Sequence, residues 1–405
     1  MCMRTVRTRC VIAGGGPAGV MLGYLLARAG IDVTVLEKWP DFFRDFRGDT
    51  IHPSTMEILA ELGILEDFLK LPHQKTRQMI GHFGGDRVTL ADFSYLKVRE
   101  PYIAFIPQWD FLTFLSGKAK QYPAFHLMME TEAIDLIKEE GKIVGVLAKN
   151  KQEQFEIRTE VVVGADGRHS TIRDKGGFEV EDLGAPIDVL WFRIPRSDKD
   201  NDQSFAYIDF GHGLVTLDRG DYWQCAFLIR KDGFEELKSG GLEALHAAVA
   251  GLAPFLEDAV RTVGSWDKVK LLSVTVDHVR EWAKDGLLLI GDAAHAMSPM
   301  GGVGINVALH DAVAAGNILV PAFRKGPPSL ASLRQVQTRR ERAVRKMQKL
   351  QVFLQDRVFA KLLNEHGHIR MPWFIRLFRV IPFLQRIPAR IIGIGFEPEH
   401  VEIGF

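Results

Sequence analysis

The stretch RCVIAGGGPAGVMLGYLLARAGIDVTVLE, residues 9–37, decides the fold of this 405-residue chain. It opens with a short apolar run, passes through the glycine-rich turn GGGPAG and enters a segment whose apolar residues recur at helical spacing. Gly30 ends that helix, and the alternating, β-branched run IDVTVL then leads to Glu37. Strand, turn, helix and strand in this order predict a βαβ unit and a parallel sheet with right-handed crossovers.

The glycines of this unit are spaced as Gly14-x-Gly16-x-x-Gly19. The first permits a tight turn, the second lets a pyrophosphate approach the backbone, and the third lets helix and strand pack closely. The N-terminus of the helix favours the same anion through its amide groups and its dipole. Glu37 ends the next strand, where a carboxylate accepts hydrogen bonds from an unphosphorylated ribose. The unit therefore predicts an adenine dinucleotide, either FAD or NAD.

The remaining chain divides into regions of different pattern. Buried-strand patterns return in VVVGADG (161–167) and GLLLIGDAAH (286–295), which extend the parallel sheet. Residues 179–275 hold short alternating runs that predict a mostly antiparallel sheet. The predicted fold class is α/β (α+β overall): a Rossmann-like dinucleotide domain, an inserted sheet domain for the substrate and a C-terminal helical region. The predicted boundaries are 1–78, 101–178 and 276–330 for the first, 79–100 and 179–275 for the second, and 331–405 for the third.

Two further motifs follow the first glycine motif in order. VVVGADGRHSTIR (161–173) carries Gly164, Asp166, Gly167, Ser170 and Arg173, and GLLLIGDAAHAMSPMGGVGIN (286–306) carries Gly291, Asp292, Ala293, His295, Pro299, Gly302, Gly304 and Asn306. These segments resemble the second and third fingerprints of flavoprotein hydroxylases of the para-hydroxybenzoate hydroxylase family. Arg47, in RGDTIHPSTMEIL, and Gln108, which opens a helix after Pro107, resemble two further flavin-contacting positions. The resemblance extends from residue 9 to about residue 320.

The resemblance implies bound FAD. Asp292, at a strand's carboxyl end, would bind the ribityl hydroxyls, and the loop from Pro299 to Asn306 would line the flavin. Its amides and the following helix dipole would stabilise negative charge on the reduced ring. His295 is expected to be a structural histidine, and Ser170 and Arg173 are expected to be local clamps. The predicted cofactor-binding residues are Gly14, Gly15, Gly16, Pro17, Ala18, Gly19, Glu37, Lys38, Arg47, Gln108, Asp166, Gly291, Asp292, Pro299, Gly302, Val303, Gly304, Ile305 and Asn306.

The activity implied is hydroxylation of an electron-rich aromatic substrate that is phenolic, quinone-type or polyketide-like. NADH or NADPH would reduce FAD, and dioxygen would then form a C4a-hydroperoxyflavin that the aromatic ring attacks. No catalytic side chain is identified; His212, Tyr222 and Trp223 are candidates only, and core or surface roles explain each of them better. Two alternatives stay open: a same-fold flavin oxidase, reductase or epoxidase, and a non-catalytic FAD-binding redox sensor.

Missing motifs narrow the chemistry. A disulfide reductase needs a CxxC pair and a second nucleotide unit, and a flavin halogenase needs a W-x-W-x-I-P segment; the sequence has neither set. No zinc-ligand cluster or nucleophile elbow appears, so no metal site is predicted. The 18 uncharged residues 10–27 are interrupted by glycines and proline, which disfavours a membrane span.

Composition adds a charge asymmetry. The chain holds 51 Lys+Arg and 51 Asp+Glu, which argues against nucleic acid as a partner, and its three cysteines fit a reducing cytoplasm. Residues 331–392 nevertheless hold 14 basic and 3 acidic residues, a net charge of +11. This tail, with Phe374, Leu377, Phe378 and Ile381 at helical spacing, predicts either packing on the dinucleotide domain or weak contact with a membrane surface.

Overall fold

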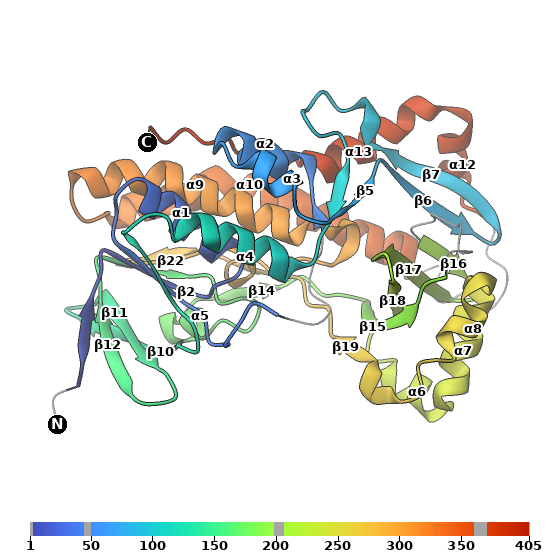
Figure 1. Ribbon diagram of the computed structural model, residues 1–405, viewed down its shortest axis with the longest axis horizontal. Coiled ribbons are helices and arrows are strands. Elements are labelled where there is room, and N and C mark those ends of the chain that lie inside the picture. The colour runs from blue at the N-terminus through green and yellow to red at the C-terminus, as the bar shows by residue number, and fades with distance from the viewer. Residues whose placement is uncertain (1–2, 44–49, 198–205, 360–370, 405) are drawn as a thin grey trace.

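The protein, described by a computed structural model over residues 3–43, 50–197, 206–359 and 371–404, is built around a six-stranded sheet (Figure 1). Its strand order is β21-β22-β13-β2-β3-β9. All neighbours from β22 to β9 are parallel, and only β21 runs against β22. The strands are β2 (Cys10–Ala13), β3 (Val33–Leu36), β9 (Phe125–Met128), β13 (Val161–Gly164), β21 (Ala283–Lys284) and β22 (Leu287–Leu289). The predicted βαβ opening and parallel sheet are confirmed.

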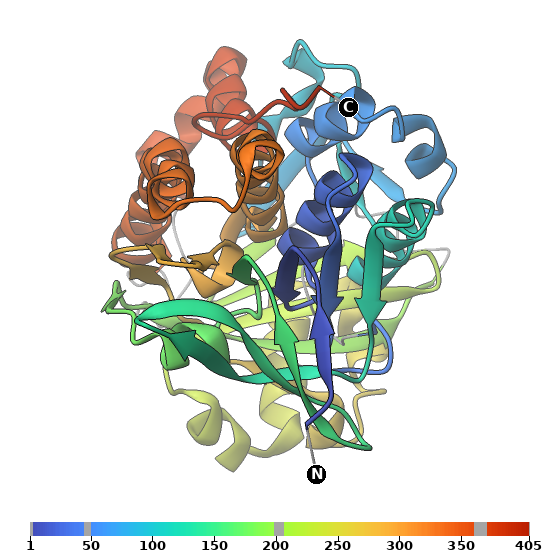
Figure 2. The same ribbon diagram turned by 90° about the vertical axis from the view of Figure 1, so that its left-hand side faces the viewer.

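Helices cover one face of this sheet, and a smaller sheet lies on the other side (Figures 1 and 2). The covering helices are α1 (Pro17–Arg28), α4 (Gln108–Ala119), α9 (Gly304–Lys325) and α10 (Leu330–Leu354). The smaller sheet has the order β1 (Thr5–Arg7), β12 (Gln154–Arg158), β11 (Lys142–Lys149) and β10 (Glu132–Glu139). Strand β10 is not evident from the sequence, because it carries four charged residues and only one fully buried residue, which mask its alternation.

A seven-stranded sheet forms the other half of the molecule and joins two distant parts of the chain. Its order is β19 (Lys270–Leu272), β15 (Ile187–Pro195), β18 (Tyr222–Arg230), β17 (His212–Asp218), β16 (Ala206–Asp209), β6 (Gln78–Phe83) and β7 (Asp86–Asp92). Every pairing is antiparallel except β16 with β6. The predicted antiparallel sheet is therefore present, and β6 and β7 are part of it.

The aromatic side chains of this sheet face mainly one way. Phe192, Trp223 and Phe227 are buried against the helix α7 (Gly241–Leu252) and form an ordinary core. Trp191 lies on the opposite face, as the alternation of a strand requires. The two helices α6 (Phe234–Ser239) and α8 (Glu257–Val260) flank α7. The sheet therefore does not present a continuous aromatic face to a substrate.

Short elements connect the two halves. A three-stranded sheet has the order β4 (Thr50–Ile51), β8 (Ile103–Phe105) and β5 (Gln74–Thr76), and β14 (Val180–Asp182) pairs with β20 (Asp277–Val279). The remaining helices of these connections are α2 (Pro53–Glu61), α3 (Leu65–Leu69) and α5 (Thr171–Gly176). The break between α2 and α3 falls at Gly63, whose φ is 73°, as the glycine at that position predicts.

The C-terminal region is only partly helical. After α10 come α12 (Trp373–Val380) and α13 (Arg386–Gly393), but residues 394–404 form no helix. They run back along α9, where Asn317 donates to the His400 carbonyl and Arg324 to that of Gly404. The prediction of a helical region over all of 331–405 is therefore wrong for its last residues. Side chains of α9 bind backbone carbonyls of this segment, so these carbonyls have partners without forming a helix.

One segment of the described chain, Met300–Lys325, is long and apolar enough to cross a membrane. It contains α9, and 78% of its most apolar window is buried. Its apolar surface is thus taken up by the sheet and by α1 and α10, as expected for a central helix of the core. Residues 10–27, whose composition first suggests a span, instead form β2, the glycine turn and most of α1.

Candidate functional site

The predicted site residues gather where parallel strands end. Ala13, Gly164 and Leu289 are register partners in β2, β13 and β22, and Ala13 also pairs with Leu36 of β3. The segments that follow these strands therefore leave the sheet at one edge. They are the first glycine loop, the Asp166 loop, the Asp292 loop and Glu37. In an open α/β sheet this edge is where a ligand binds.

The first glycine loop has two positions that admit no side chain and one that faces open space. A Cβ at Gly14, where φ is 109°, would lie 2.3 Å from the Ala165 carbonyl oxygen, and one at Gly19 would lie 2.0 Å from that of Gly14. A Cβ at Gly16 would meet no atom within 4 Å. The loop thus packs tightly against the protein at Gly14 and Gly19 and leaves room at Gly16, where the motif places a pyrophosphate.

Helix α1 begins at Pro17 with no acidic residue in its first turn and no side chain capping its N-terminus. Within the described residues, its first amides and its dipole therefore have no capping side chain and no acid of the same turn beside them. Ala18 is buried beside the loop, and Lys38 is exposed with its ammonium 5.6 Å from the centre of the Trp39 ring. The start of α1 suits an anion held in the space in front of Gly16.

Glu37 ties β3 to the glycine loop. One carboxylate oxygen accepts from the Gly15 amide at 3.1 Å, and the other accepts from the Trp39 amide at 3.1 Å. The side chain is 9% exposed. The carboxylate therefore fixes the loop and lies at the end of β3, where the motif places the ribose.

The Asp166 loop is stabilised from within. The Asp166 carboxylate accepts from the Ser170 hydroxyl at 2.5 Å and from the Ile172 amide at 3.1 Å, and burial raises its pKa. Ser170 in turn caps α5 by accepting from the Arg173 amide, and the Arg173 guanidinium donates to the Arg168 carbonyl. Ser170 and Arg173 are placed as local clamps. Asp166 stands at the predicted edge, but its carboxylate serves the start of α5.

Arg168 lies at the site but is not among the residues predicted from the sequence. Its Nε donates to Asp292 at 3.1 Å, and one terminal nitrogen donates to the Met297 carbonyl at 3.1 Å. The other terminal nitrogen is buried and has no partner among the described residues. The signal in the sequence is a basic residue directly after Gly167, which links the second motif to the third. Arg168 therefore orients Asp292 and keeps one donor available.

The loop from Pro299 to Asn306 leads into α9 through a short turn, Met300–Gly302, and begins the helix at Gly304. Gly302 has φ 63°, and a Cβ there would lie 2.5 Å from Thr50 Oγ1. A Cβ at Gly304 would meet no atom within 4 Å. Like α1, α9 has no side-chain cap and no acidic residue in its first turn. The loop thus packs against Thr50 at Gly302, whereas Gly304 faces open space.

Asn306 anchors this loop rather than facing open space. Its amide group donates to the carbonyls of Thr50 and Gly302, and its oxygen accepts from the His52 amide and the Thr55 hydroxyl. The side chain is 4% exposed, so its hydrogen-bonding capacity is used within the protein. Val303 is buried and Ile305 is half-buried beside it. Asn306 therefore holds the loop from Pro299 to Asn306 in shape.

The two helix starts lie close together. A Cβ on Gly291, at φ 61°, would be 3.3 Å from the Ala18 Cβ and 3.4 Å from the Ala308 Cβ. Only a residue without a side chain lets α1, α9 and the Asp292 loop approach in this way. Open space at Gly16 and Gly304, two uncapped helix N-termini and an acid between them together fit an elongated ligand with an anionic centre.

His295 belongs to a buried polar cluster behind the site. Its Nε2 lies 2.7 Å from Asp311, and Arg340 of α10 donates to the same carboxylate at 3.0 Å. All three side chains are at most 3% exposed. Burial alone would raise the pKa of Asp311, but the hydrogen bonds and charges of His295 and Arg340 lower it. The expected structural role of His295 agrees with this geometry.

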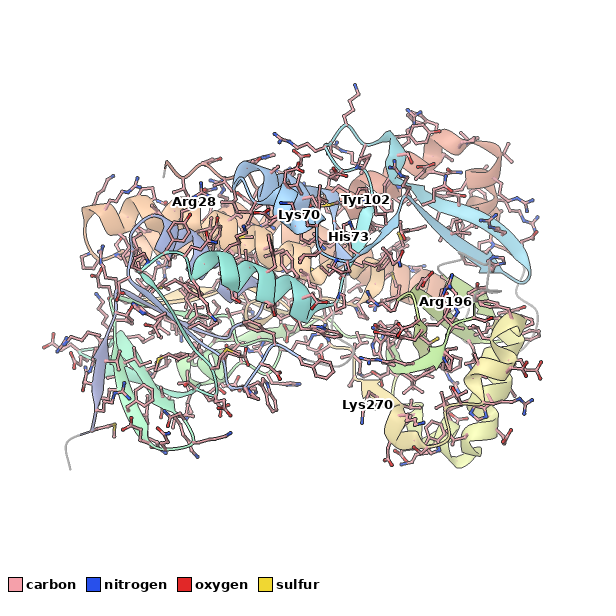
Figure 3. All side chains as sticks on the ribbon, in the orientation of Figure 1. Arg28, Lys70, His73, Tyr102, Arg196 and Lys270 are labelled. Atoms are coloured by element: carbon pink, nitrogen blue, oxygen red, sulfur yellow. The ribbon has the colours of Figure 1, made fainter. Side chains whose placement is uncertain are left out.

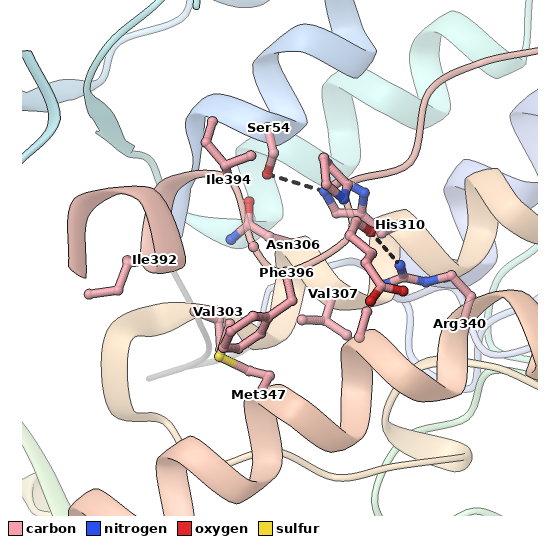
Figure 4. A pocket seen from close by; sticks show the side chains of 14 residues that line it. Ser54, Val303, Asn306, Val307, His310, Arg340, Met347, Ile392, Ile394 and Phe396 are labelled. Carbon is pink, nitrogen blue, oxygen red and sulfur yellow. Dashed lines mark hydrogen bonds between the residues drawn. The ribbon is translucent and has the colours of Figure 1, made fainter. Parts of the chain in front are cut away.

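A small cavity, which Val303 and Asn306 also line, lies beside the start of α9, between α9, α10 and residues 392–398 (Figure 4). Its volume is about 30 Å³, which suits a water molecule and not an aromatic substrate. His310 lines it; its Nδ1 accepts from the Glu399 amide, and its Nε2 lies 3.1 Å from the Ser54 hydroxyl. Burial lowers the pKa of His310 to about 3. This cavity is structural.

Two predicted positions remain. Gln108 is the first residue of α4, directly after β8 and Pro107, as the sequence predicts. Arg47 lies outside the described residues. The candidates His212, Tyr222 and Trp223 do not gather: Trp223 is in the core under α7, His212 lies near the Phe227 ring, and Tyr222 packs under Arg193.

Comparison with known proteins decides the family. Residues 7–350 match the model described as the FAD binding domain. The chain belongs to this family of FAD-dependent aromatic monooxygenases. It is therefore an oxidoreductase with FAD as its cofactor, and the resemblance in the three motifs is confirmed.

Among curated relatives, 6-methylpretetramide 4-monooxygenase of Streptomyces rimosus is 31% identical over 362 residues, which cover 87% of this chain and 85% of that protein. Pentachlorophenol 4-monooxygenase of Sphingobium chlorophenolicum is 26% identical over 314 residues, covering 76% of this chain but 57% of the longer relative. The solved structure of PqsL, a probable FAD-dependent monooxygenase from Pseudomonas aeruginosa, superposes with a TM-score of 0.75 at 21% identity, over 89% of this chain and 100% of that one. The predicted fold class is confirmed.

Proposed function

We propose that this FAD-dependent monooxygenase hydroxylates a polycyclic, polyketide-type phenol or quinone at the expense of NADH or NADPH. The balance is one aromatic C–H bond, one O2, one NAD(P)H and one proton giving one phenol, one water and NAD(P)+. The observation that carries the substrate class is the 31% identity, over most of both chains, to a relative named for its action on 6-methylpretetramide.

The cofactor-binding residues follow from the edge of the parallel sheet. Gly16 and the start of α1 would hold the pyrophosphate, and Glu37 the adenosine ribose. Asp292, oriented by Arg168, would accept from the ribityl hydroxyls. The start of α9 at Gly304 would place its positive dipole beside the flavin ring. Bound FAD supplies the redox chemistry by taking a hydride from the nicotinamide and passing electrons to dioxygen.

An apolar surface beside the α9 loop suits an aromatic ring. Trp191 and Val215 are both register partners of Ala226, so their side chains share one face of the seven-stranded sheet. Trp191 and Val215 also pack against the cluster that holds Phe105, and Phe105 pairs with Thr50. Thr50 donates to the Gly302 carbonyl. We assign this face as the wall against which the substrate is positioned and water is excluded.

The test is product formation by the FAD-loaded chain. NADH and NADPH oxidation would be followed with a panel of simple phenols, hydroxylated anthraquinones and tetracyclic polyketides, under 18O2. A polycyclic substrate that accelerates NAD(P)H oxidation and gains one labelled oxygen atom would support the proposal. If compounds accelerate NAD(P)H oxidation but none of them gains a labelled oxygen atom, the protein is an oxidase or a reductase. NAD(P)H oxidation that no compound changes would contradict an aromatic hydroxylase.

A variant separates the substrate wall from the cofactor site. Trp191→Ala should raise KM for the polycyclic substrate about tenfold, because the side chain is removed from the proposed contact face. FAD content should not change, since Trp191 lies outside the edge where the parallel strands end. Leu271→Ala, on exposed β19 of the same sheet, is the matched control and should leave KM unchanged.

A further inference from the structure

The positive charge of the C-terminal region is distributed unevenly. On α10, five basic residues are paired with acids of neighbouring segments: Arg339 with Glu399 and Glu402, Arg340 with Asp311, Arg342 and Lys346 with Glu397, and Arg345 with Glu181. These pairs neutralise much of α10. Residues 371–393, by contrast, hold four arginines and no acid. Within the described part of the tail, the segment formed by α12, α13 and the turn between them thus carries positive charge with no acid of its own.

One side of this segment is docked on the seven-stranded sheet. Ile375 of α12 is buried with Phe83 and Ile208, and Ala389 of α13 is buried with Phe93. Arg379 pairs with Asp86 of β7 at 3.1 Å. The segment is thus held in a fixed orientation on the outer edge of the sheet, at the upper right of Figure 1.

The other side carries large apolar residues with no cover. Trp373, Val380 and Phe383 are 75%, 77% and 62% exposed. Leu377, Ile381 and Ile387 belong to the same exposed surface. The predicted stripe is therefore divided: Phe378 packs inward on the Ile375 cluster, while Trp373, Leu377 and Val380 share the outer side at a spacing of i, i+4, i+7. A surface of this kind on an ordered segment marks an interaction site.

The charges beside this surface indicate what covers it. Arg376, Arg386 and Arg390 are exposed and form no ion pair within the described part of the chain; the Arg386 guanidinium lies over the Tyr95 and Phe383 rings. Arginines around exposed tryptophan, phenylalanine and aliphatic side chains match a helix that lies in an anionic lipid interface. A second copy of the chain is disfavoured, because two such surfaces would bring like charges together.

We propose that the outer side of residues 373–390 is a docking surface for an anionic membrane, with its apolar side chains entering the boundary between headgroups and acyl chains. The docked inner side orients the seven-stranded sheet toward the bilayer. This inference is independent of the aromatic substrate, because it rests on the surface alone.

The experiment is flotation of the FAD-loaded full chain with phosphatidylcholine vesicles, with and without phosphatidylglycerol. The protein should float with the anionic vesicles and be released by salt. A triple variant, Trp373→Ser, Val380→Ser and Phe383→Ser, should weaken this binding about 100-fold. Arg376→Gln with Arg390→Gln should weaken it roughly 25-fold at low salt, at about a factor of five per arginine.

The matched control is Lys270→Gln with Leu271→Ser. Both residues are exposed on β19, at the opposite edge of the sheet from β7 (Figure 3), and binding should be unchanged. Unaltered FAD content and thermal midpoint would show that each variant is folded. A second readout uses the wild-type chain itself. Brominated lipid should quench its tryptophan fluorescence, and this quenching should be smaller in Trp373→Phe.

Three results would overturn the proposal. The first is a wild-type chain that stays unbound at every proportion of phosphatidylglycerol. The second is equal binding of the wild-type chain and the folded triple variant. The third is a wild-type dimer in sedimentation that the triple variant converts to a monomer, since a second copy would then be what covers the surface.

Discussion

The glycine loops at the starts of α1 and α9 have the same design but are held in different ways. Each precedes an uncapped helix and has one glycine facing open space, Gly16 in the first and Gly304 in the second. The first loop is fixed by Glu37 and the neighbouring strands. The second is fixed by Thr50 and residues 52–55, about 250 positions earlier in the chain. An anion site can thus be built locally or assembled by tertiary contacts.

The largest effect should come from filling the first loop. Gly14→Val would place Cβ 2.3 Å from the Ala165 carbonyl at a positive φ, so we expect a loss of more than about 4 kcal/mol in stability, or no folded protein. A Cβ at position 16 would meet no atom within 4 Å, so the Gly16→Val apoprotein should keep its thermal midpoint while the Kd for FAD rises at least about tenfold. Titration of apoprotein with FAD, alongside calorimetry, checks both. Equal thermal midpoints and equal FAD affinities in the two variants would contradict the separate roles assigned to Gly14 and Gly16.

The second loop should be destabilised when the hydrogen bonds of Asn306 to residues 50–55 are removed. Asn306→Ala removes the side-chain hydrogen bonds made to the Thr50 carbonyl, the His52 amide and the Thr55 hydroxyl, and should lower the free energy of unfolding by about 3 kcal/mol. Asn317→Ala, on the same helix but in a more exposed contact with His400, should cost about 1 kcal/mol or less. Denaturant titration of both variants measures the difference. A smaller loss of stability at position 306 than at position 317 would contradict the proposed role of Asn306 in holding the loop.

Acid should weaken the same long-range assembly through His310. Burial lowers its pKa from 6.5 to about 3, so below pH 6.5 the unfolded chain takes up a proton that the folded chain does not. The stability is therefore full above about pH 6.5 and falls as the pH drops, by about 2 kcal/mol at pH 5 from this residue. His310→Gln should flatten that pH dependence. Thermal midpoints between pH 5 and 7.5 provide the measurement, and an unchanged slope in the variant would exclude His310.

A smaller effect should follow from Arg168→Met. Asp292 would lose the donor that orients it, so the Kd for FAD should rise about fivefold, while Arg168→Lys should recover part of the loss. Arg196→Met removes an ion pair of the same length, 3.1 Å to Asp218, in the other sheet and should leave FAD affinity unchanged. FAD titration of the three variants tests this, and a wild-type Kd in Arg168→Met would remove Arg168 from the site.

Residue types and spacing indicated much of the site in advance. The turn at Gly14 to Gly19, the acid at Glu37 and the start of α4 at Gln108 all depend on short stretches, and they lie where the sequence predicts. Arg168 escaped notice because its partner is 124 residues away. Asn306 was expected to contact the flavin, but its side chain forms hydrogen bonds with residues of β4 and α2. Contacts of this kind leave no periodicity or spacing in the sequence.

The sequence by itself determined the βαβ opening, the parallel sheet, the three motifs and the family, because these depend on local turns and on burial patterns within a few residues. Only the tertiary structure decided how the second half is assembled. It set the strand order of the second sheet, with β6 beside β16 and parallel to it, paired most of the charge of α10, and turned one side of α12 and α13 outward. The physical reason is that strand order, ion pairing and exposure are set by segments that meet only in the folded chain.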